Sequence, residues 1–191
     1  PRLLVKLLRD VADALAALHR VGLLHRDVKP ENLYRDAGGA WRLGDLGGVT
    51  RGDLDEGSGL ADLAGTPAYW APEVFAGEAD ARSDLYALGV VGYLSVSGRL
   101  PFEAANLPAV LVRQATERAP AILRAAPGLP PALAAAIDRC LARQPAERFA
   151  DGEALAAALA PAPDNRPVLP TTLRAWLDAR NPLLVPYMGW S

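Results

Sequence analysis

The eight residues 25–32, HRDVKPEN, limit what this chain can fold into more than any other part of its sequence. They carry two cations, two anions, an amide, a histidine and a proline, and they directly follow the apolar residues VGLL. Neither the period of an amphipathic helix nor the alternation of a strand accounts for this mixture. We therefore predict a loop here, whose polar side chains form part of a functional site.

Regular structure is predicted on both sides of this loop. Leucine and valine recur at three- and four-residue spacing over residues 4–18, which indicates an amphipathic helix that stops at Gly22. LYRD and AWRL flank AGG, which predicts a short β-hairpin over residues 33–43. Residues 44–72 are rich in Gly and Asp with little periodicity, so we expect a long loop there.

The second half of the chain is predicted to be helical. The segment SDLYALGVVGYLSVSG is apolar almost all round, which indicates a buried helix that Ser83 caps and Gly98 ends. Further helices are expected near residues 105–116, 131–143 and 151–159. The last part, 161–191, is predicted to be a Pro-rich linker and a tail, whose aromatic end fits either a short packed helix or the approach to a membrane segment beyond it.

Composition narrows the class of protein. The chain has 191 residues, 51% of them hydrophobic, and a formal net charge of -2, which indicates a folded domain rather than a disordered chain. A net charge this close to zero provides no positive electrostatic field to attract nucleic acid, so we expect no nucleic-acid partner. The single cysteine, Cys140, excludes an internal disulfide and fits a reducing compartment.

Four polar residues supply complementary chemical tools. Asp27 can accept a proton from a hydroxyl, and Lys29, two residues later, can sit on a phosphate oxygen. Asn32 offers an amide oxygen to a hard cation such as magnesium. Asp45, in DLG, follows Asn32 by thirteen residues, beyond the predicted hairpin. Because a hairpin brings its two ends together, we expect Asn32 and Asp45 to meet at one metal.

These motifs resemble those of the eukaryotic-type serine/threonine protein kinases. HRDVKPEN is similar to the catalytic loop (25–32), DLG to the metal-binding triplet that opens the activation segment (45–73), and GTPAYWAPE to the substrate-docking segment. The resemblance covers residues 1–160. It implies a mostly α fold, the C-terminal lobe of a kinase with a short β-hairpin at the catalytic loop, from a bacterial source.

The resemblance also implies the role of each site residue. Asp27 is the catalytic base, Lys29 steadies the transferring phosphate of ATP, and Asn32 and Asp45 hold Mg²⁺. Lys29 is typical of kinases that act on serine and threonine, and the hydroxyl of Thr66 is expected to bridge Asp27 and Lys29. The expected partner is a protein substrate with Ser or Thr.

Other matches are expected to support the site. Glu73 and Arg148 resemble a buried ion pair of the family. Asp84 is expected to accept hydrogen bonds from the backbone of the catalytic loop, although a helix-start aspartate favoured by the helix dipole is the alternative. His25 is interpreted as a packed structural residue rather than an acid or base.

The activation segment departs from the family pattern. Kinases with an arginine before the catalytic aspartate, here Arg26, commonly need a phosphate in this segment. Asp62 stands at the usual position of that phosphate. We hypothesise that Asp62 pairs with Arg26 as a fixed substitute; the alternative is a solvated loop aspartate. Thr50 and Ser58 are further candidates for modification.

The nucleotide site departs from the family too. Tyr34 stands where a small aliphatic residue normally lies beneath the adenine, so its ring either stacks on the base or fills the pocket. Gly44 is expected to give compensating room, and Leu46 replaces a phenylalanine conservatively. The sequence contains no Gly-rich loop, strand lysine or helical glutamate, and its start lacks a methionine, so we expect a chain cut from a longer protein, without the N-lobe.

Two functions follow from these expectations. The first is a serine/threonine kinase fragment that transfers the γ-phosphate of ATP once an N-lobe completes it, in the cytoplasm or on the cytoplasmic side of a membrane-anchored protein. The alternative is a pseudokinase-like binding or scaffold module. The complete set of Asp27, Lys29, Asn32 and Asp45 favours the enzyme.

One expectation concerns the isolated chain. Because the family binds ATP between two lobes, the 191-residue chain alone provides one wall of the site. We expect it to bind ATP too weakly for a micromolar dissociation constant in titration calorimetry and to be inactive by itself. A micromolar affinity would show that this chain holds a complete nucleotide site.

Overall fold

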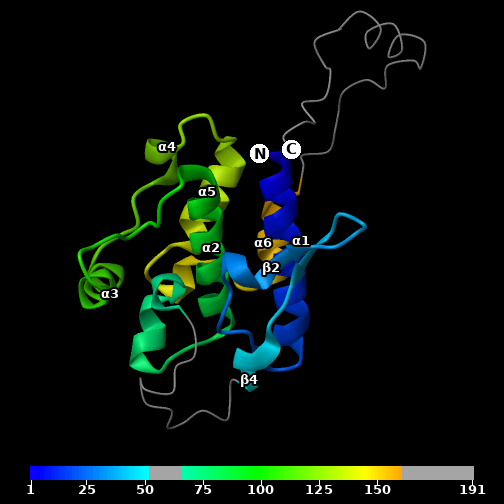
Figure 1. Cartoon of the computed structure of the whole chain (residues 1–191), viewed down its shortest axis with the longest axis horizontal. Coiled ribbons are helices and arrows are strands. Elements are labelled where there is room, and N and C mark those ends of the chain that lie inside the picture. Colours follow the sequence, from blue (N-terminus) through cyan, green and yellow to red (C-terminus); the bar gives the residue numbers. More distant parts are fainter. Residues whose placement is uncertain (52–65, 161–191) are drawn as a thin grey trace, which may run out of the picture. The chain divides into compact units, whose positions relative to one another are not determined.

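The structure is a computed structural model that describes residues 1–51 and 66–160. These residues are mostly helical, as predicted, with short strands between the first two helices (Figure 1). The helices are α1 (Arg2–Arg20), α2 (Ala81–Ser97), α3 (Leu107–Thr116), α4 (Ile122–Ala125), α5 (Pro131–Cys140) and α6 (Gly152–Ala158). The strands are β1 (Leu23–Leu24), β2 (Leu33–Arg35), β3 (Trp41–Leu43) and β4 (Thr50–Arg51). Short 3₁₀ turns are η1 (Pro30–Asn32), η2 (Leu46–Gly48), η4 (Pro67–Tyr69), η5 (Pro72–Ala76) and η6 (Pro145–Glu147).

Helix α2 is the central element of the core. Every residue from 83 to 93 is buried, because α1 and α5 both pack against this helix (Figure 1). Its apolar sequence on all sides is the composition that such a position requires. Helix α1 instead buries one stripe and lies beside α6. The buried residues of that stripe are Leu4, Leu7, Leu8, Val11, Ala12, Leu15 and Ala16.

The ends of α2 confirm one prediction and correct another. Gly98 ends the helix in the left-handed conformation, with φ of 69°. The N-cap is Asp80, not Ser83 as predicted: the Asp80 side chain accepts from the helix backbone, and the Ser83 hydroxyl accepts from the Asp80 N–H at 3.1 Å. Ser83 is therefore the third helical residue of a capping box.

The predicted hairpin is present. Strands β2 and β3 pair antiparallel with Leu33 opposite Leu43 and Arg35 opposite Trp41. A second pairing, β1 with β4, joins Leu24 to Thr50 inside the segment that was expected to be a long loop. Strands of two residues are too short to show alternation, which is why the sequence pattern missed them.

The remaining helices lie close to their predicted positions, and α4 is an addition that a four-residue helix leaves no sequence period to reveal. A search of residues 1–51 and 66–160 finds no helix with the length and apolar character needed to cross a bilayer. The tail at 161–191 lies outside the described residues, so its predicted linker and membrane approach stay predictions.

The predicted ion pair between Glu73 and Arg148 is confirmed. The Arg148 guanidinium donates to both carboxylate oxygens, at 2.6 and 2.8 Å, with side-chain exposures of 0% for Arg148 and 8% for Glu73. Nε and the two Nη atoms of Arg148 each also donate to a backbone carbonyl, and the guanidinium stacks on the Tyr86 ring at 4.9 Å. A buried charge is tolerated when its donors are satisfied in this way. The pair ties η5 to the start of α2 and the segment after α5.

Removal of one partner of this pair should leave the other charge buried and alone. We expect Glu73→Gln to lower the free energy of unfolding at pH 7 by about 3–5 kcal/mol in urea denaturation. Glu117→Gln, in the exposed pair of Glu117 with Arg113, is the matched control and should change it far less. An equal loss of unfolding free energy in both variants would mean that the buried pair stabilises the fold no more than the exposed pair does.

The same variant has a predicted pH dependence. Burial alone would raise the pKa of Glu73, but the hydrogen bonds and charge of Arg148, with the Ser83 hydroxyl, outweigh burial and hold the pKa below its ordinary 4.5. The stabilisation is therefore complete above the pKa of the unfolded chain and is lost as the pH falls through the folded value. We expect the difference between wild type and Glu73→Gln to shrink below about pH 4.

Candidate active site

Hydrogen bonds to the first turn of α2 hold the loop that follows β1. Asp84, 3% exposed, accepts the backbone N–H of His25 at 2.9 Å and that of Arg26 at 2.8 Å. This confirms the expected role of Asp84 over a simple dipole interaction. His25 is fully buried, and its Nε2 lies 3.2 Å from the Gly44 carbonyl, which fits its interpretation as a packed structural residue.

Two residues at this site have an unusual backbone. Among the described residues, the non-glycine residues with positive φ are Arg26, at 63°, and Asp45, at 59°. Left-handed backbone is unfavourable for residues with a side chain and persists where the surroundings fix it. The hydrogen bond from Arg26 N–H to Asp84 fixes the first, and a bond from Gly47 N–H to the Asp45 carboxylate, at 3.2 Å, supports the second. Both therefore turn the chain at the points where the predicted site residues begin.

Asp27, Lys29 and Asn32 form one hydrogen-bonded cluster. The Lys29 ammonium lies 2.7 Å from Asp27 Oδ2. The Asn32 amide donates to the same oxygen at 2.9 Å and to the Asp27 carbonyl at 2.8 Å. The hydrogen bond with Asp27 raises the pKa of Lys29 above its ordinary value, so the ammonium stays charged at physiological pH. The sequence spacing predicted that these three residues would act together, and the structure brings them together.

The hairpin brings Asp45 to the same place. The Gly44 N–H donates to the Asn32 carbonyl at 2.8 Å, which extends the β2–β3 ladder to the residue next to Asp45. Gly48 passes close to the loop: a Cβ there would lie 3.7 Å from the Asp27 Cβ. The loop that contains Asp27 and the segment that contains Asp45 therefore meet at one end of the hairpin. Asp45 is exposed there.

The chemistry of the Asn32 and Asp45 side chains suits a magnesium ion. Because the Asn32 NH₂ group donates to Asp27, its amide oxygen faces away from these bonds and is available as a ligand. One carboxylate and one amide oxygen make a sparse set, which suits Mg²⁺ because it keeps waters and substrate phosphates as ligands. In the part of the chain that the structure describes, no group of three or more His, Cys, Asp or Glu residues forms a closed metal site.

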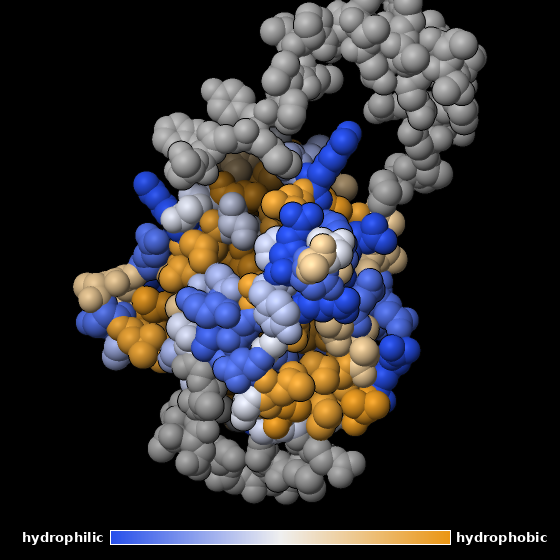
Figure 2. All heavy atoms as spheres, turned by 45° about the vertical axis from the view of Figure 1, so that its right-hand side comes forward, coloured by the Kyte–Doolittle hydropathy of each residue, from blue (hydrophilic) through white to orange (hydrophobic). Residues whose placement is uncertain are grey.

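Two large apolar side chains are exposed close to Asp45 along the chain or beside its neighbour Gly44. Tyr34 is 56% exposed and Leu46 is 60% exposed. Figure 2 shows hydrophobic and polar side chains in separate clusters over one face of the molecule. The Tyr34 ring lies against Gly44, because a Cβ at that position would be 2.7 Å from Tyr34 Cε1. Gly44 therefore provides the room that the sequence led us to expect.

The remaining predicted residues are placed as follows. Thr66 is exposed at the start of η4, and within the described ranges its hydroxyl makes no hydrogen bond to Asp27 or Lys29, so the predicted bridge stays a prediction. Thr50 lies in β4. Asp62 and Ser58 lie outside the described residues, and so does the proposed pairing of Asp62 with Arg26.

Sequence reasoning missed two residues that support the site. His19, in the last turn of α1, points its Nε2 at Asp84 Oδ2, 2.8 Å away. Gln114, 1% exposed on α3, donates to the Ala68 carbonyl in η4 at 3.1 Å. A polar residue on an otherwise apolar helix face was the signal available for both.

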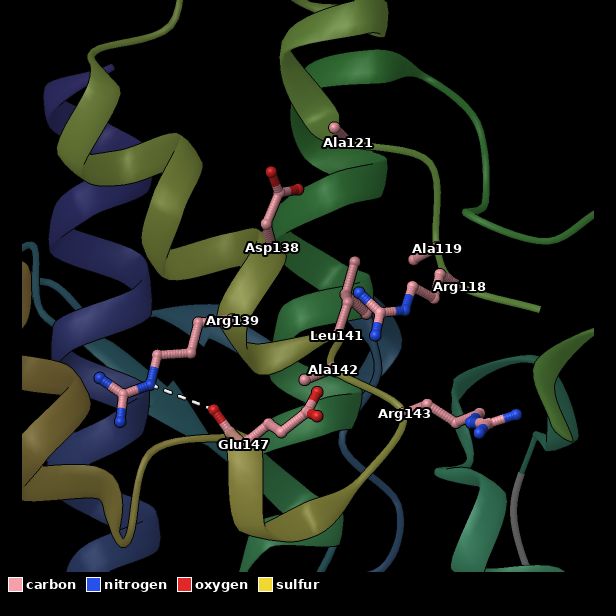
Figure 3. Close-up of a pocket in the computed structure, with 9 residues that line it drawn as sticks. All are labelled: Arg118, Ala119, Ala121, Asp138, Arg139, Leu141, Ala142, Arg143 and Glu147. Atoms are coloured by element: carbon pink, nitrogen blue, oxygen red, sulfur yellow. Dashed lines mark hydrogen bonds between the residues drawn. The ribbon is translucent and has the colours of Figure 1, made fainter. Parts of the chain in front are cut away.

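One pocket among the described residues lies apart from the predicted site residues. It is formed by α5 and the segments on either side of it, and Figure 3 shows charged side chains around its rim. None of the predicted site residues is among those that line it, which are Arg118, Ala119, Ala121, Asp138, Arg139, Leu141, Ala142, Arg143 and Glu147.

Comparison with known proteins is consistent with this geometry. The family model described as the protein kinase domain matches residues 1–159. Serine/threonine-protein kinase PknL of Mycobacterium tuberculosis is 37% identical over 160 residues, which are 83% of this chain and 40% of that protein. Serine/threonine-protein kinase Pkn1 of Myxococcus xanthus is 40% identical over 152 residues, 76% of this chain and 22% of that protein. The chain thus spans 40% or less of the length of these relatives.

The contact between Tyr34 and Gly44 can be tested by a double-mutant cycle. We expect Gly44→Ala to cost about 1 kcal/mol of unfolding free energy more in the wild type than in a Tyr34→Leu background, because the added methyl displaces the ring. Gly128→Ala, where nothing lies within 4 Å of the new Cβ, is the control and should show no such coupling. Additive effects at Tyr34 and Gly44 would rule out the contact.

Proposed function

The chain belongs to the protein kinase domain family, and from this membership we propose that it is the larger, C-terminal lobe of a bacterial serine/threonine protein kinase. In this proposal its parent protein transfers the γ-phosphate of ATP to serine and threonine hydroxyls of protein substrates. The relatives named as serine/threonine kinases support the reaction class. One observation carries the proposal: Asp27, Lys29 and Asn32 share one hydrogen-bonded cluster, and the Gly44–Asn32 bond sets Asp45 beside it.

Asp27 has the arrangement that a catalytic base needs. Both side-chain contacts that the described residues make with its carboxylate fall on Oδ2, from Lys29 and Asn32. This leaves Oδ1 to accept a hydrogen bond from a substrate hydroxyl. A base held in this way orients the hydroxyl for attack and takes up its proton.

Lys29 serves two groups in this proposal. Its ammonium neutralises Asp27 in the free protein, and its three donors can also reach a phosphate oxygen when a nucleotide is bound. The raised pKa of Lys29 keeps the cation available over the physiological pH range. Positioning and charge neutralisation of this kind supply most of the rate in phosphoryl transfer.

Asn32 and Asp45 would hold Mg²⁺, which when bound with ATP neutralises charge on the phosphate oxygens. Tyr34 and Leu46, both exposed, would offer apolar surface to the nucleotide. An aromatic ring that is 56% exposed offers a face on which a base can stack. A smaller N-lobe seated over this surface would cover the nucleotide and complete the site.

The alternative function is a pseudokinase-like scaffold that binds partners without turnover. Tyr34 is the observation that favours it, because the ring lies against Gly44 and occupies space beside the metal residues. We favour the enzyme, since a scaffold does not need a base, a phosphate-binding lysine and two metal ligands in one part of the structure. We also propose a cytoplasmic location, where ATP is available and the buried Cys140 thiol stays reduced.

The proposal is tested by Asp27→Asn in the full-length protein. We expect the rate of phosphate transfer from ATP to a serine or threonine peptide to fall by about 10²- to 10⁴-fold, because asparagine cannot accept the proton. Nucleotide affinity, measured by calorimetry in the presence of Mg²⁺, should change little, whereas Asp45→Asn should weaken it.

Asp13→Asn, at an exposed aspartate on α1 that is not part of the cluster, is the matched control and should leave the rate unchanged. A wild-type protein that transfers no phosphate while it retains partner binding would support the scaffold instead. Transfer to tyrosine peptides at the same rate as to serine peptides would contradict the proposed specificity for serine and threonine.

A further inference from the structure

A buried glutamine on α3 holds the middle of the short turn η4. Gln114 is 1% exposed, and its Nε2 donates to the Ala68 carbonyl at 3.1 Å. Ala68 precedes Gln114 by 46 residues, and α3 packs against both η4 and η5. Because a carbonyl oxygen only accepts hydrogen bonds, the amide nitrogen of the glutamine must face it. The bond is therefore a directed link between two segments that are distant in sequence.

The amide oxygen of Gln114 shows what a glutamine adds at this position. Oε1 is buried and has no hydrogen-bond partner among the residues that the structure describes. A buried acceptor without a donor is unfavourable, so an apolar side chain of the same length would pack here at a lower cost. The bond to Ala68 is therefore the interaction that a glutamine provides here and a methionine would not.

The backbone bonds described for η4 leave the Ala68 carbonyl without a donor. The Tyr69 N–H donates to the Thr66 carbonyl at 3.0 Å. The Trp70 N–H donates to the Pro67 carbonyl at 3.1 Å. The next carbonyl, that of Ala68, is one of the orphan groups that every short helix has at its end. The side chain from α3 supplies its donor, so the conformation of η4 depends on α3.

The turn η4 also lies close to the loop 25–32. Thr66, the N-cap of η4, directly precedes it. Burial raises the pKa of the Tyr69 hydroxyl, and the negative charge of Glu31 raises it further, so these two side chains are within electrostatic range of each other. The segment GTPAYWAPE, which contains η4, resembles the substrate-docking segment of kinases. A change in η4 would therefore be felt beside the polar cluster.

We infer that Gln114 is a positioning residue for the protein substrate: it holds the Ala68 carbonyl, this bond fixes the conformation of η4, and η4 sets how tightly a peptide docks near Asp27. The part that concerns the peptide rests on the proposed kinase function, whereas the part that concerns η4 does not. Because Gln114 is buried, it acts through η4 and not by contact with the substrate.

The experiment compares three variants of the full-length protein. Gln114→Met removes the donor and keeps the length of the side chain, and Gln114→His returns an N–H at a similar reach. Gln144→Met makes the same change at an exposed glutamine and is the matched control. Amide hydrogen exchange at Tyr69 and Trp70 reports the stability of η4 without requiring activity. Steady-state kinetics with ATP and a serine peptide report kcat and the KM of each substrate.

We expect Gln114→Met to speed exchange at Tyr69 and Trp70 by about fivefold to tenfold, while exchange in the centre of α2 stays unchanged. The KM for the peptide should rise by about fivefold to tenfold, with kcat and the KM for ATP within about twofold of the wild type, because the lost interaction affects peptide binding alone. Gln114→His should recover most of both effects, and Gln144→Met should resemble the wild type. If Gln114→Met does not fold, Gln114→Leu takes its place.

The outcomes separate this inference from the proposed function. Unchanged exchange at Tyr69 and Trp70 in Gln114→Met overturns the inference, whatever the activity. A lower kcat with an unchanged peptide KM also overturns it, because Gln114 would then affect the chemical step. Failure of Gln114→His to restore slow exchange overturns it as well, since the effect would be one of packing alone. A wild-type protein without phosphate transfer that still shows the exchange pattern supports the role of Gln114 in fixing η4 and overturns the kinase function.

Discussion

The site depends on one buried carboxylate, that of Asp84, at the first turn of α2. A carboxylate that is 3% exposed is costly unless donors surround it, and here the donors are His19 and the backbone N–H groups of His25 and Arg26. The same bonds fix the loop that precedes Asp27. Because α2 is buried on all sides, its first turn is a rigid support for this loop. A helix that looks purely structural thus sets the position of the polar cluster.

The neighbouring residue does the same for a second segment. The Ser83 hydroxyl donates to Glu73 Oε1 at 2.7 Å, and Arg148 donates to both oxygens of Glu73. Two adjacent residues of α2 therefore hold the loop that precedes Asp27 and the short helix η5. A change in the first turn of α2 would move both, which couples the orientation of the base to the surface that presents the substrate in the proposed function.

Sequence reasoning was accurate where a pattern is local or a motif is specific. The helix period of α1, the turn AGG in the hairpin and the apolar run of α2 each describe one segment, and each prediction is confirmed. The Glu73–Arg148 pair was predicted from the resemblance and is confirmed. The β1–β4 pairing was missed, because it joins short segments that carry no period of their own. The exchange of Ser83 for Asp80 as the N-cap shows that several capping residues near one another leave the helix start open by one turn.

The sequence by itself determined the family, the helical class and the chemical identity of Asp27, Lys29, Asn32 and Asp45, because these follow from residue types at fixed spacing. Tertiary structure alone decided which oxygen of Asp27 is occupied, that the Tyr34 ring lies against Gly44, and that His19 completes the donors of Asp84. These contacts join residues through directions and distances of side chains, which depend on how α1, α2 and the hairpin pack. No one-dimensional pattern carries that information, since hydrogen bonds between distant segments form only after the core has set the elements in place.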